Sequence, residues 1–281
     1  MTDRTLTYEV DDPVATITLR RPERLNAMNG EMFVALRRSI ENAAADPSVV
    51  GIVITGAGRA FSAGLDTDAL SAIAGAGQAS GTAGDDPGAT TEQRKGLFSY
   101  LTDIPKPIIA AVNGVAAGGG YVLATMCDLR FGGPEARFTT VFSKRGLVAE
   151  HGTTWTTPRL VGIGHALDLL WTSRMVGAEE AHRLGLLEYL VGDPVHEAQE
   201  YVRTLAATAS PTAIADTKRM VWDHAGRDLD TSLDDMWAVV EAQFGRPDIA
   251  EGVQSFLEKR APAFPRLDTP DAAPWHRGTF R

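Results

Sequence analysis

Residues 108–128 read IIAAVNGVAAGGGYVLATMCD, and they are the most informative part of the sequence for the fold. Its first five residues are apolar, as in a short β-strand, and the run stops at Asn113-Gly114, a dipeptide typical of turns. The glycine triplet at residues 118–120 then opens a segment rich in helix formers. The stretch therefore predicts a strand, a tight turn and the start of a helix.

The glycine triplet also predicts a binding site for negative charge. Glycine leaves backbone N–H groups unshielded, and the first turn of a helix carries N–H groups without acceptors and a partial positive charge. A helix packed closely on a sheet explains the same triplet equally well. The stretch is nearly long enough to span a membrane, but Asn113 and the glycines make it a poor span, so we expect no membrane segment.

The composition is that of a folded globular protein. A chain of 281 residues can form one large domain or one domain with an appendage, and its 44% hydrophobic content is ordinary. The net charge of −9 and the lack of a basic stripe argue against a nucleic-acid partner. The single Cys127 excludes an intrachain disulfide and a multi-cysteine metal site, so no metal is predicted. Charged residues near the N-terminus interrupt any signal peptide, and we expect a reducing, cytoplasmic location.

The chain before residue 108 predicts a parallel sheet covered by helices. Apolar residues and threonines alternate over residues 15–19, as in a half-buried strand. Asn29 is a suitable N-cap for a helix whose apolar residues recur on one face until Asp46-Pro47. Residues 49–55 are almost all apolar or β-branched, which is typical of a strand buried on both faces.

Before the glycine triplet, a short helical piece is expected to end at Leu70. The chain after the triplet is predicted to be mainly helical, with one short strand at residues 136–141. Residues 74–91 are predicted to be mobile, because their composition cannot bury a core. The tail after Pro265 is predicted to be loose or to lie on a neighbouring subunit. Helical patterns occupy residues 166–173, 178–184, 197–209, 211–224, 231–244 and 247–259.

Several short motifs occur in a characteristic order. They are RPERLNAM at residues 21–28, FSAGLD at 61–66, KP at 106–107, NG at 113–114, GGG at 118–120, CD at 127–128, EG at 251–252 and FLEKR at 256–260. Together they resemble the crotonase (enoyl-CoA hydratase/isomerase) superfamily over nearly the whole chain.

This resemblance implies an α/β fold, in which a crotonase-like spiral of ββα units is followed by a C-terminal helical trimerisation module. Residues 1–200 would then form the acyl-CoA-binding core, and residues 201–281 the helical assembly module. The resemblance also implies a homotrimer or a dimer of trimers. It implies an acyl-CoA thioester substrate, so coenzyme A is part of the substrate and no separate cofactor is expected.

The resemblance further implies an oxyanion hole made of two backbone N–H groups, those of Leu65 and Gly119. Enolate chemistry beside a thioester develops negative charge on the carbonyl oxygen, and donors fixed beforehand stabilise that charge without reorganisation. Because the donors belong to the backbone, we expect the Leu65 side chain to be replaceable and Gly119 not to be.

The resemblance places the remaining substrate contacts in several separate segments. Lys259 is expected to meet a CoA phosphate across a subunit interface, although Lys259 and Arg24 also fit the description of solvated surface charges. The contacts that the resemblance implies are Arg24, Ala27, Ala63, Asp66, Thr67, Val115, Gly118, Phe142, Leu147 and Lys259.

The acid/base residue is where the sequence departs from the hydratases that use two glutamates. Val122 and Phe142 stand at the positions of those glutamates, and neither can transfer a proton. Glu150 instead matches the acidic base of certain enoyl-CoA and dienoyl-CoA isomerases. A single carboxylate is sufficient to remove an allylic proton and return it two carbons away. We expect apolar neighbours, including Leu147 and Trp155, to raise the pKa of Glu150.

Alternatives remain at this point. The same Glu150 is compatible with an enoyl-CoA hydratase, other superfamily chemistries such as thioester hydrolysis are possible, and loss of the paired glutamates is compatible with a non-catalytic acyl-CoA-binding protein. His151 is a minor candidate for the base, and we expect its side chain to point elsewhere because neighbouring side chains diverge. We expect Cys127 to be a buried small hydrophobe and not a nucleophile.

Overall fold

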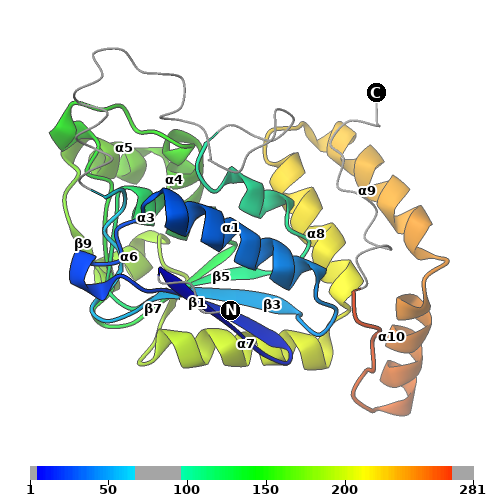
Figure 1. The fold of residues 1–281 in the computed structure, drawn as a ribbon. Coiled ribbons are helices and arrows are strands. Elements are labelled where there is room, and N and C mark those ends of the chain that lie inside the picture. Colours follow the sequence, from blue (N-terminus) through cyan, green and yellow to red (C-terminus); the bar gives the residue numbers. More distant parts are fainter. Residues whose placement is uncertain (1–4, 67–95, 268–281) are drawn as a thin grey trace.

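The computed structural model describes residues 5–66 and 96–267, which form two β-sheets surrounded by helices (Figure 1). In the larger sheet, β1 pairs antiparallel with β2 and every other neighbouring pair is parallel. Its strand order is β1 (Leu6–Asp11), β2 (Val14–Leu19), β3 (Gly51–Gly56), β5 (Ile108–Val112), β7 (Leu129–Gly132) and β10 (Tyr189–Leu190). The order in the smaller sheet is β4 (Ala60–Ser62), β6 (Val115–Ala117), β8 (Arg137–Thr139) and β9 (Val176–Gly177).

The chain alternates between the two sheets. It passes from β3 to β4, from β5 to β6 and from β7 to β8, and each time it leaves the larger sheet for the smaller one. A helix follows in two of these turns: α3 (Gly119–Met126) after β6, and α4 (Thr153–Val161) after β8. This repeated path is the predicted spiral of ββα units.

Both faces of the larger sheet are buried, as the apolar character of residues 49–55 predicts. Ile52 and Ile54 of β3 pack into the main core, whereas Val53 between them packs into a second core on the other face. Helix α1 (Gly30–Ala45) contacts β1 and β2, and α7 (Pro194–Thr208) covers β3, β5 and β7. Figure 1 shows α1 and α7 on opposite sides of the sheet. The predicted N-cap of α1 is confirmed, because the Asn29 side chain accepts the Met32 N–H.

The stretch 108–128 folds as predicted at both ends but contains an additional strand. Between the turn at Asn113-Gly114 and helix α3 lies β6, which pairs with β4 and β8. Three residues next to glycine are too few to show a period, so this strand could not be predicted. Asn113 holds the turn in place: its amide donates to Gly56 O at 2.8 Å and to Gly58 O at 2.9 Å.

The C-terminal part is helical, as predicted. Residue 200, the predicted end of the acyl-CoA-binding core, lies within α7, and Val202 of this helix belongs to the second core. Asp128 joins the core to α8, because it accepts the Trp222 Nε1–H at 3.0 Å and pairs with Lys218 Nζ at 2.7 Å. The remaining helices are α5 (Ile163–Thr172), α6 (Ala178–Leu184), α8 (Pro211–His224), α9 (Leu229–Gln243) and α10 (Pro247–Glu258), with short 3-10 turns η1 (Pro22–Arg24), η2 (Ser99–Asp103) and η3 (Ser143–Arg145).

Some predictions concern segments outside the described residues. They are the helical piece ending at Leu70, the mobile segment 74–91 and most of the tail after Pro265. Within the described ranges, no helix combines the length and the apolar character needed to cross a membrane.

Candidate active site

Leu65 lies on an extended segment beside Met28, with which it forms a short parallel bridge. The bridge is made by the Met28 N–H, which donates to Gly64 O at 2.7 Å, and by the Asp66 N–H, which donates to Met28 O at 3.0 Å. Because N–H groups alternate in direction along an extended chain, the Leu65 N–H points away from Met28. The bridge thus leaves the Leu65 N–H available as a donor.

Gly119 is the first residue of α3, so its N–H belongs to the group at a helix start that has no acceptor within the helix. It lies beside Leu65: a Cβ atom built on Gly119 would be 3.6 Å from Leu65 N. Gly64 also lies against the start of α3, because a Cβ atom built on Gly64 would be 2.8 Å from Gly119 N and 2.6 Å from Ala117 O. The structure therefore brings the two predicted donors side by side, at a point where only glycine fits at position 64.

A buried polar clamp holds the Leu65 segment. The Arg21 guanidinium pairs with Asp66 at 2.8 Å and donates to Ala27 O at 2.6 Å. The fully buried Asn26 donates to Ala60 O at 2.7 Å, and Ser62 Oγ donates back to Asn26 O at 2.8 Å. Arg21, Asn26 and Ser62 were not among the predicted site residues, although all three lie in the motifs quoted above.

Four of the predicted CoA contacts lie in the two neighbouring segments, 21–28 and 61–66, that this clamp holds together. Arg24 is exposed on η1, Ala27 is buried, and the Ala63 N–H donates to Leu25 O at 2.9 Å. The Asp66 side chain is only 8% exposed and is paired with Arg21, so it stabilises the clamp itself. Thr67 lies outside the described residues.

Glu150 lies in the turn before α4. Its carbonyl oxygen accepts the Thr153 N–H at 3.0 Å, and its side chain remains 36% exposed. Partial burial raises the pKa of Glu150 above its ordinary value of 4.5, as predicted. Helix α4 is tied to α3 by a 3.0 Å hydrogen bond between the Tyr121 and Thr157 hydroxyls, so the carboxylate and the Gly119 donor come from two connected elements.

The prediction that His151 points away from Glu150 is wrong. His151 has a left-handed backbone with φ of 53°, and this turns its ring so that Nε2 lies 3.6 Å from Glu150 Oε2. The ring is 7% exposed, and its Nδ1 accepts the Leu97 N–H at 3.4 Å. Burial lowers the pKa of His151 below 6.5, so the neutral ring is favoured.

The apolar residues of the site region differ in their surroundings. Val122 and Phe142 are buried, whereas Leu147 is partly exposed. Trp155 stacks on Trp222 of α8 with ring centroids 5.8 Å apart, so the indole packs against the helical module.

Three further predictions concern residues close to α3. Cys127 is buried, as predicted, and burial raises the pKa of its thiol to about 12. Gly118 has φ of 51°, and its N–H donates to Thr139 O at 3.1 Å. Val115 opens β6 and is partly buried.

Lys259 is not brought to the site within one chain. It is exposed at the end of α10, and Figure 1 shows α10 on the opposite side of the molecule from α3 and α4. A contact between Lys259 and a ligand at Gly119 would therefore require a second subunit.

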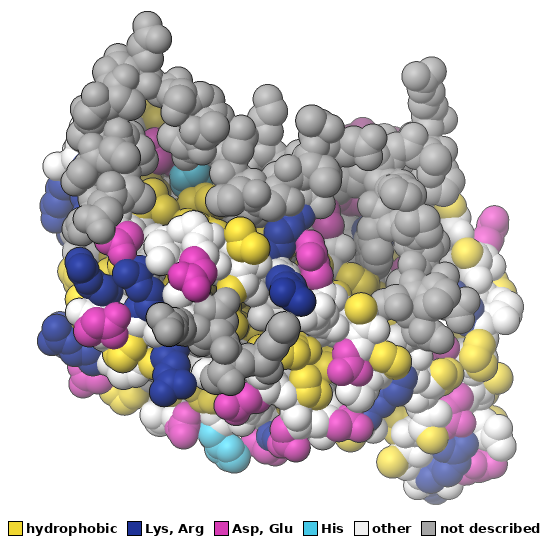
Figure 2. Space-filling model, in the orientation of Figure 1, with side chains coloured by type: hydrophobic (Ala, Val, Ile, Leu, Met, Phe, Trp, Pro, Cys, Tyr) yellow, Lys and Arg dark blue, Asp and Glu magenta, His cyan; other side chains and the backbone are white. Residues whose placement is uncertain are grey.

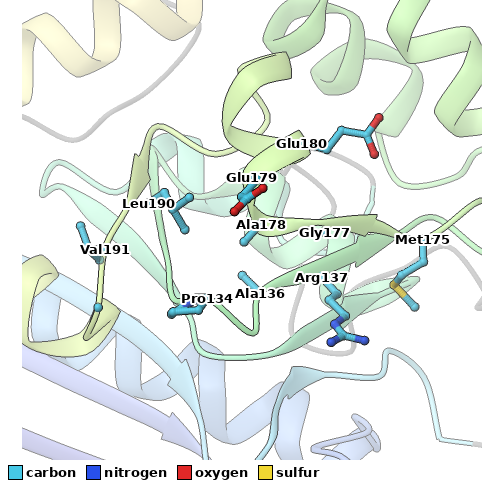
Figure 3. A pocket seen from close by; sticks show the side chains of 11 residues that line it. Pro134, Ala136, Arg137, Met175, Gly177, Ala178, Glu179, Glu180, Leu190 and Val191 are labelled. Atoms are coloured by element: carbon cyan, nitrogen blue, oxygen red, sulfur yellow. The ribbon is translucent and has the colours of Figure 1, made fainter.

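A separate open cavity of about 720 Å³ lies beside β8, β9 and the start of α6 (Figure 3). None of the described residues that line it is a predicted site residue. The Glu180 carboxylate at its edge is held by Arg174 with two contacts of 2.9 Å, and Arg137 is within 3.4 Å of Glu135.

In residues 5–66 and 96–267, no three His, Cys, Asp or Glu side chains are grouped so that they could hold a metal ion.

Comparison with known proteins shows the family of the chain. Residues 9–266 match the family model described as enoyl-CoA hydratase/isomerase. The chain is 35% identical to 1,2-epoxyphenylacetyl-CoA isomerase of Escherichia coli K12, covering 91% of this chain and 96% of the relative. It is 30% identical to the peroxisomal Delta(3,5)-Delta(2,4)-dienoyl-CoA isomerase of Arabidopsis thaliana, covering 92% and 94%.

Solved structures show the same architecture. Enoyl-CoA hydratase of Mycobacterium tuberculosis H37Rv superposes with a TM-score of 0.82 at 27% identity, over 93% of this chain and 99% of that one. An enoyl-CoA hydratase of Polaromonas sp. JS666 gives a TM-score of 0.83 at 26% identity, over 92% and 99%. Because the family model spans residues 9–266 and the Escherichia coli and Arabidopsis thaliana relatives are at least 30% identical over nearly the whole chain, the chain belongs to the enoyl-CoA hydratase/isomerase family of the crotonase superfamily and is an acyl-CoA-processing enzyme.

Proposed function

We propose that the protein is an enoyl-CoA isomerase that uses Glu150 as its single acid/base and the Leu65 and Gly119 N–H groups as its oxyanion hole. Glu150 takes a proton from C2 of a 3-enoyl-CoA, and the C–H electron pair forms a dienolate. The negative oxygen of the dienolate accepts hydrogen bonds from the two N–H groups. The same carboxyl group returns the proton at C4. The double bond then lies between C2 and C3, and no atom is gained or lost.

The observation that carries this proposal is that apolar side chains stand at both positions where two-glutamate hydratases carry their acids, while Glu150 remains as the carboxylate that matches the isomerases. Val122 and Phe142, which stand where two-glutamate hydratases carry their acids, are both buried and apolar. A 1,3-proton shift needs one group that serves both carbons, whereas hydration also needs a group to orient the water. The Escherichia coli and Arabidopsis thaliana relatives are both named as isomerases, which supports the same choice.

A second candidate, hydration of a 2-enoyl-CoA, is favoured by one observation. The His151 ring lies 3.6 Å from Glu150 and can supply a second polar group beside it. In either case we propose that coenzyme A is part of the substrate, that it is held by the predicted contact residues and that no separate cofactor takes part.

The proposal is tested with acyl-CoA thioesters of equal chain length. We expect the protein to convert 3-enoyl-CoA into 2-enoyl-CoA, which is followed by the absorbance of the conjugated thioester. We expect hydration of 2-enoyl-CoA and release of free thiol to be at least tenfold slower. Faster hydration than isomerisation would favour the second candidate, and binding without turnover of any thioester would indicate a non-catalytic protein.

We also propose that the chain assembles as a trimer or a dimer of trimers through its C-terminal helices. Apolar side chains are exposed along α9 and α10, and Figure 2 shows yellow side chains on the surface at α10. Such a surface is unusual for a monomer and is typical of an assembly interface. The exposed apolar residues are Leu229, Leu233, Trp237, Phe244, Ile249, Val253, Phe256 and Leu257.

The assembly is tested by light scattering, which should give three or six times the 30.0 kDa of one chain. Phe256 is 81% exposed on α10, so Phe256→Glu should dissociate the assembly by placing a charge in the interface. Gln254→Glu adds the same charge at a polar position of the same helix and serves as the control. A stable wild-type monomer at micromolar concentration would contradict the proposal and the expected role of Lys259.

A further inference from the structure

His151 contacts two different parts of the molecule through its two ring nitrogens. Nδ1 accepts the Leu97 N–H at 3.4 Å, and Nε2 lies 3.6 Å from Glu150 Oε2. Leu97 lies just before η2, so one imidazole ring connects this segment with the turn that carries the carboxylate.

The contact with Leu97 determines where the ring carries its proton. A backbone N–H is only a donor, so Nδ1 must be the unprotonated acceptor. The ring is buried, and burial favours the neutral form, in which one nitrogen carries the proton. The proton is therefore on Nε2, the nitrogen that faces Glu150.

The backbone at position 151 is arranged for this orientation. A positive φ of 53° is unusual for a residue with a side chain, and it keeps the two neighbouring side chains on one side of the turn. The segment that carries Leu97 lies against this turn, because a Cβ atom built on Gly96 would be in ordinary van der Waals contact with His151 Cα at 3.6 Å. Strained residues of this kind persist where the surrounding structure requires them.

We infer that His151 is a positioning residue for Glu150: its Nε2–H, oriented through the Leu97 N–H on Nδ1, directs Glu150 Oε2 toward the substrate. At 3.6 Å the Nε2–H and the carboxylate attract each other without a hydrogen bond, and contacts of this kind commonly shorten when the substrate binds. The inference rests on the proposed role of Glu150 as the acid/base.

Two amide variants separate the two nitrogens. In His151→Asn the side-chain oxygen can take the place of Nδ1 and accept the Leu97 N–H, but nothing replaces the Nε2–H. In His151→Gln the amide N–H can take the place of Nε2–H. We expect His151→Asn to lower kcat by about 10- to 100-fold with KM within about twofold, since a poorly oriented base costs rate more than binding. We expect His151→Gln to retain kcat to within about threefold.

A second measurement does not depend on activity. Nitrogen-15 spectra of the histidine-labelled wild-type protein should show His151 as the neutral ring with the proton on Nε2 at pH 7. Equal kcat values for the Asn and Gln variants, whether high or low, would contradict the inference, and so would a proton on Nδ1. Failure of the proposed function is recognised separately, because Glu150→Gln would then retain turnover whatever the His151 variants do.

Discussion

Glu150→Gln is expected to reduce kcat by about 100- to 10,000-fold while leaving the affinity for acyl-CoA nearly unchanged. Glutamine keeps the size of the side chain but cannot accept the substrate proton at neutral pH. The backbone donors and most of the predicted CoA contacts lie in other segments, so the change acts mainly on proton transfer and little on the ground state. Steady-state kinetics with the best thioester, together with calorimetric binding of an unreactive acyl-CoA, provide the measurement.

The matched control is Glu135→Gln, which makes the same chemical change at a side chain that is 77% exposed before β8. This variant should retain the activity of the wild type. If Glu150→Gln also remains active, Glu150 is not the base, and another acidic or histidine side chain has to take that role.

The second large effect is expected at Gly64. Its φ of 93° is unfavourable for any other residue, and an alanine Cβ would lie 2.6 Å from Ala117 O and 2.8 Å from Gly119 N. Gly64→Ala should therefore separate the segments that carry the Leu65 and Gly119 donors. Loss of one such donor costs about 100- to 1,000-fold in kcat, and we expect a loss of at least this size.

Two controls distinguish this effect from general damage. Gly164→Ala lies at an exposed position of α5, where among the described residues nothing lies within 4 Å of an added Cβ, so activity should be unchanged. Leu65→Ala keeps the backbone N–H and should change kcat by only a few-fold. Thermal unfolding should show whether Gly64→Ala is folded; a folded variant with normal kcat would show that the proposed oxyanion hole is wrong.

The parts of the fold that could be predicted are those with a clear residue pattern. Residues 49–55 are continuous enough to predict a doubly buried strand, and the spacing of apolar residues after Asn29 predicts α1. Strand β6 could not be predicted, because three small residues flanked by glycine have no period.

The candidate site was predictable where it depends on motifs and was not where it depends on contacts between distant segments. Leu65 and Gly119 are 54 positions apart in the sequence, and their motifs alone indicated that they meet. The clamp of Arg21, Asn26 and Ser62 requires the three-dimensional arrangement of both loops. The orientation of His151 was missed because a left-handed backbone is uncommon for histidine, and nothing in the neighbouring sequence demands it.

The proposed oxyanion hole has a consequence for how this enzyme can evolve. Its two donors are peptide groups, so almost any substitution of Leu65 except proline leaves them in the chain, provided that Gly64, Gly119 and the Arg21 clamp are kept. The acid/base group, in contrast, is a single side chain on a turn between η3 and α4. A descendant of this chain can therefore acquire a new reaction on the same thioester by exchanging one turn residue, while it inherits the means of stabilising the enolate intact.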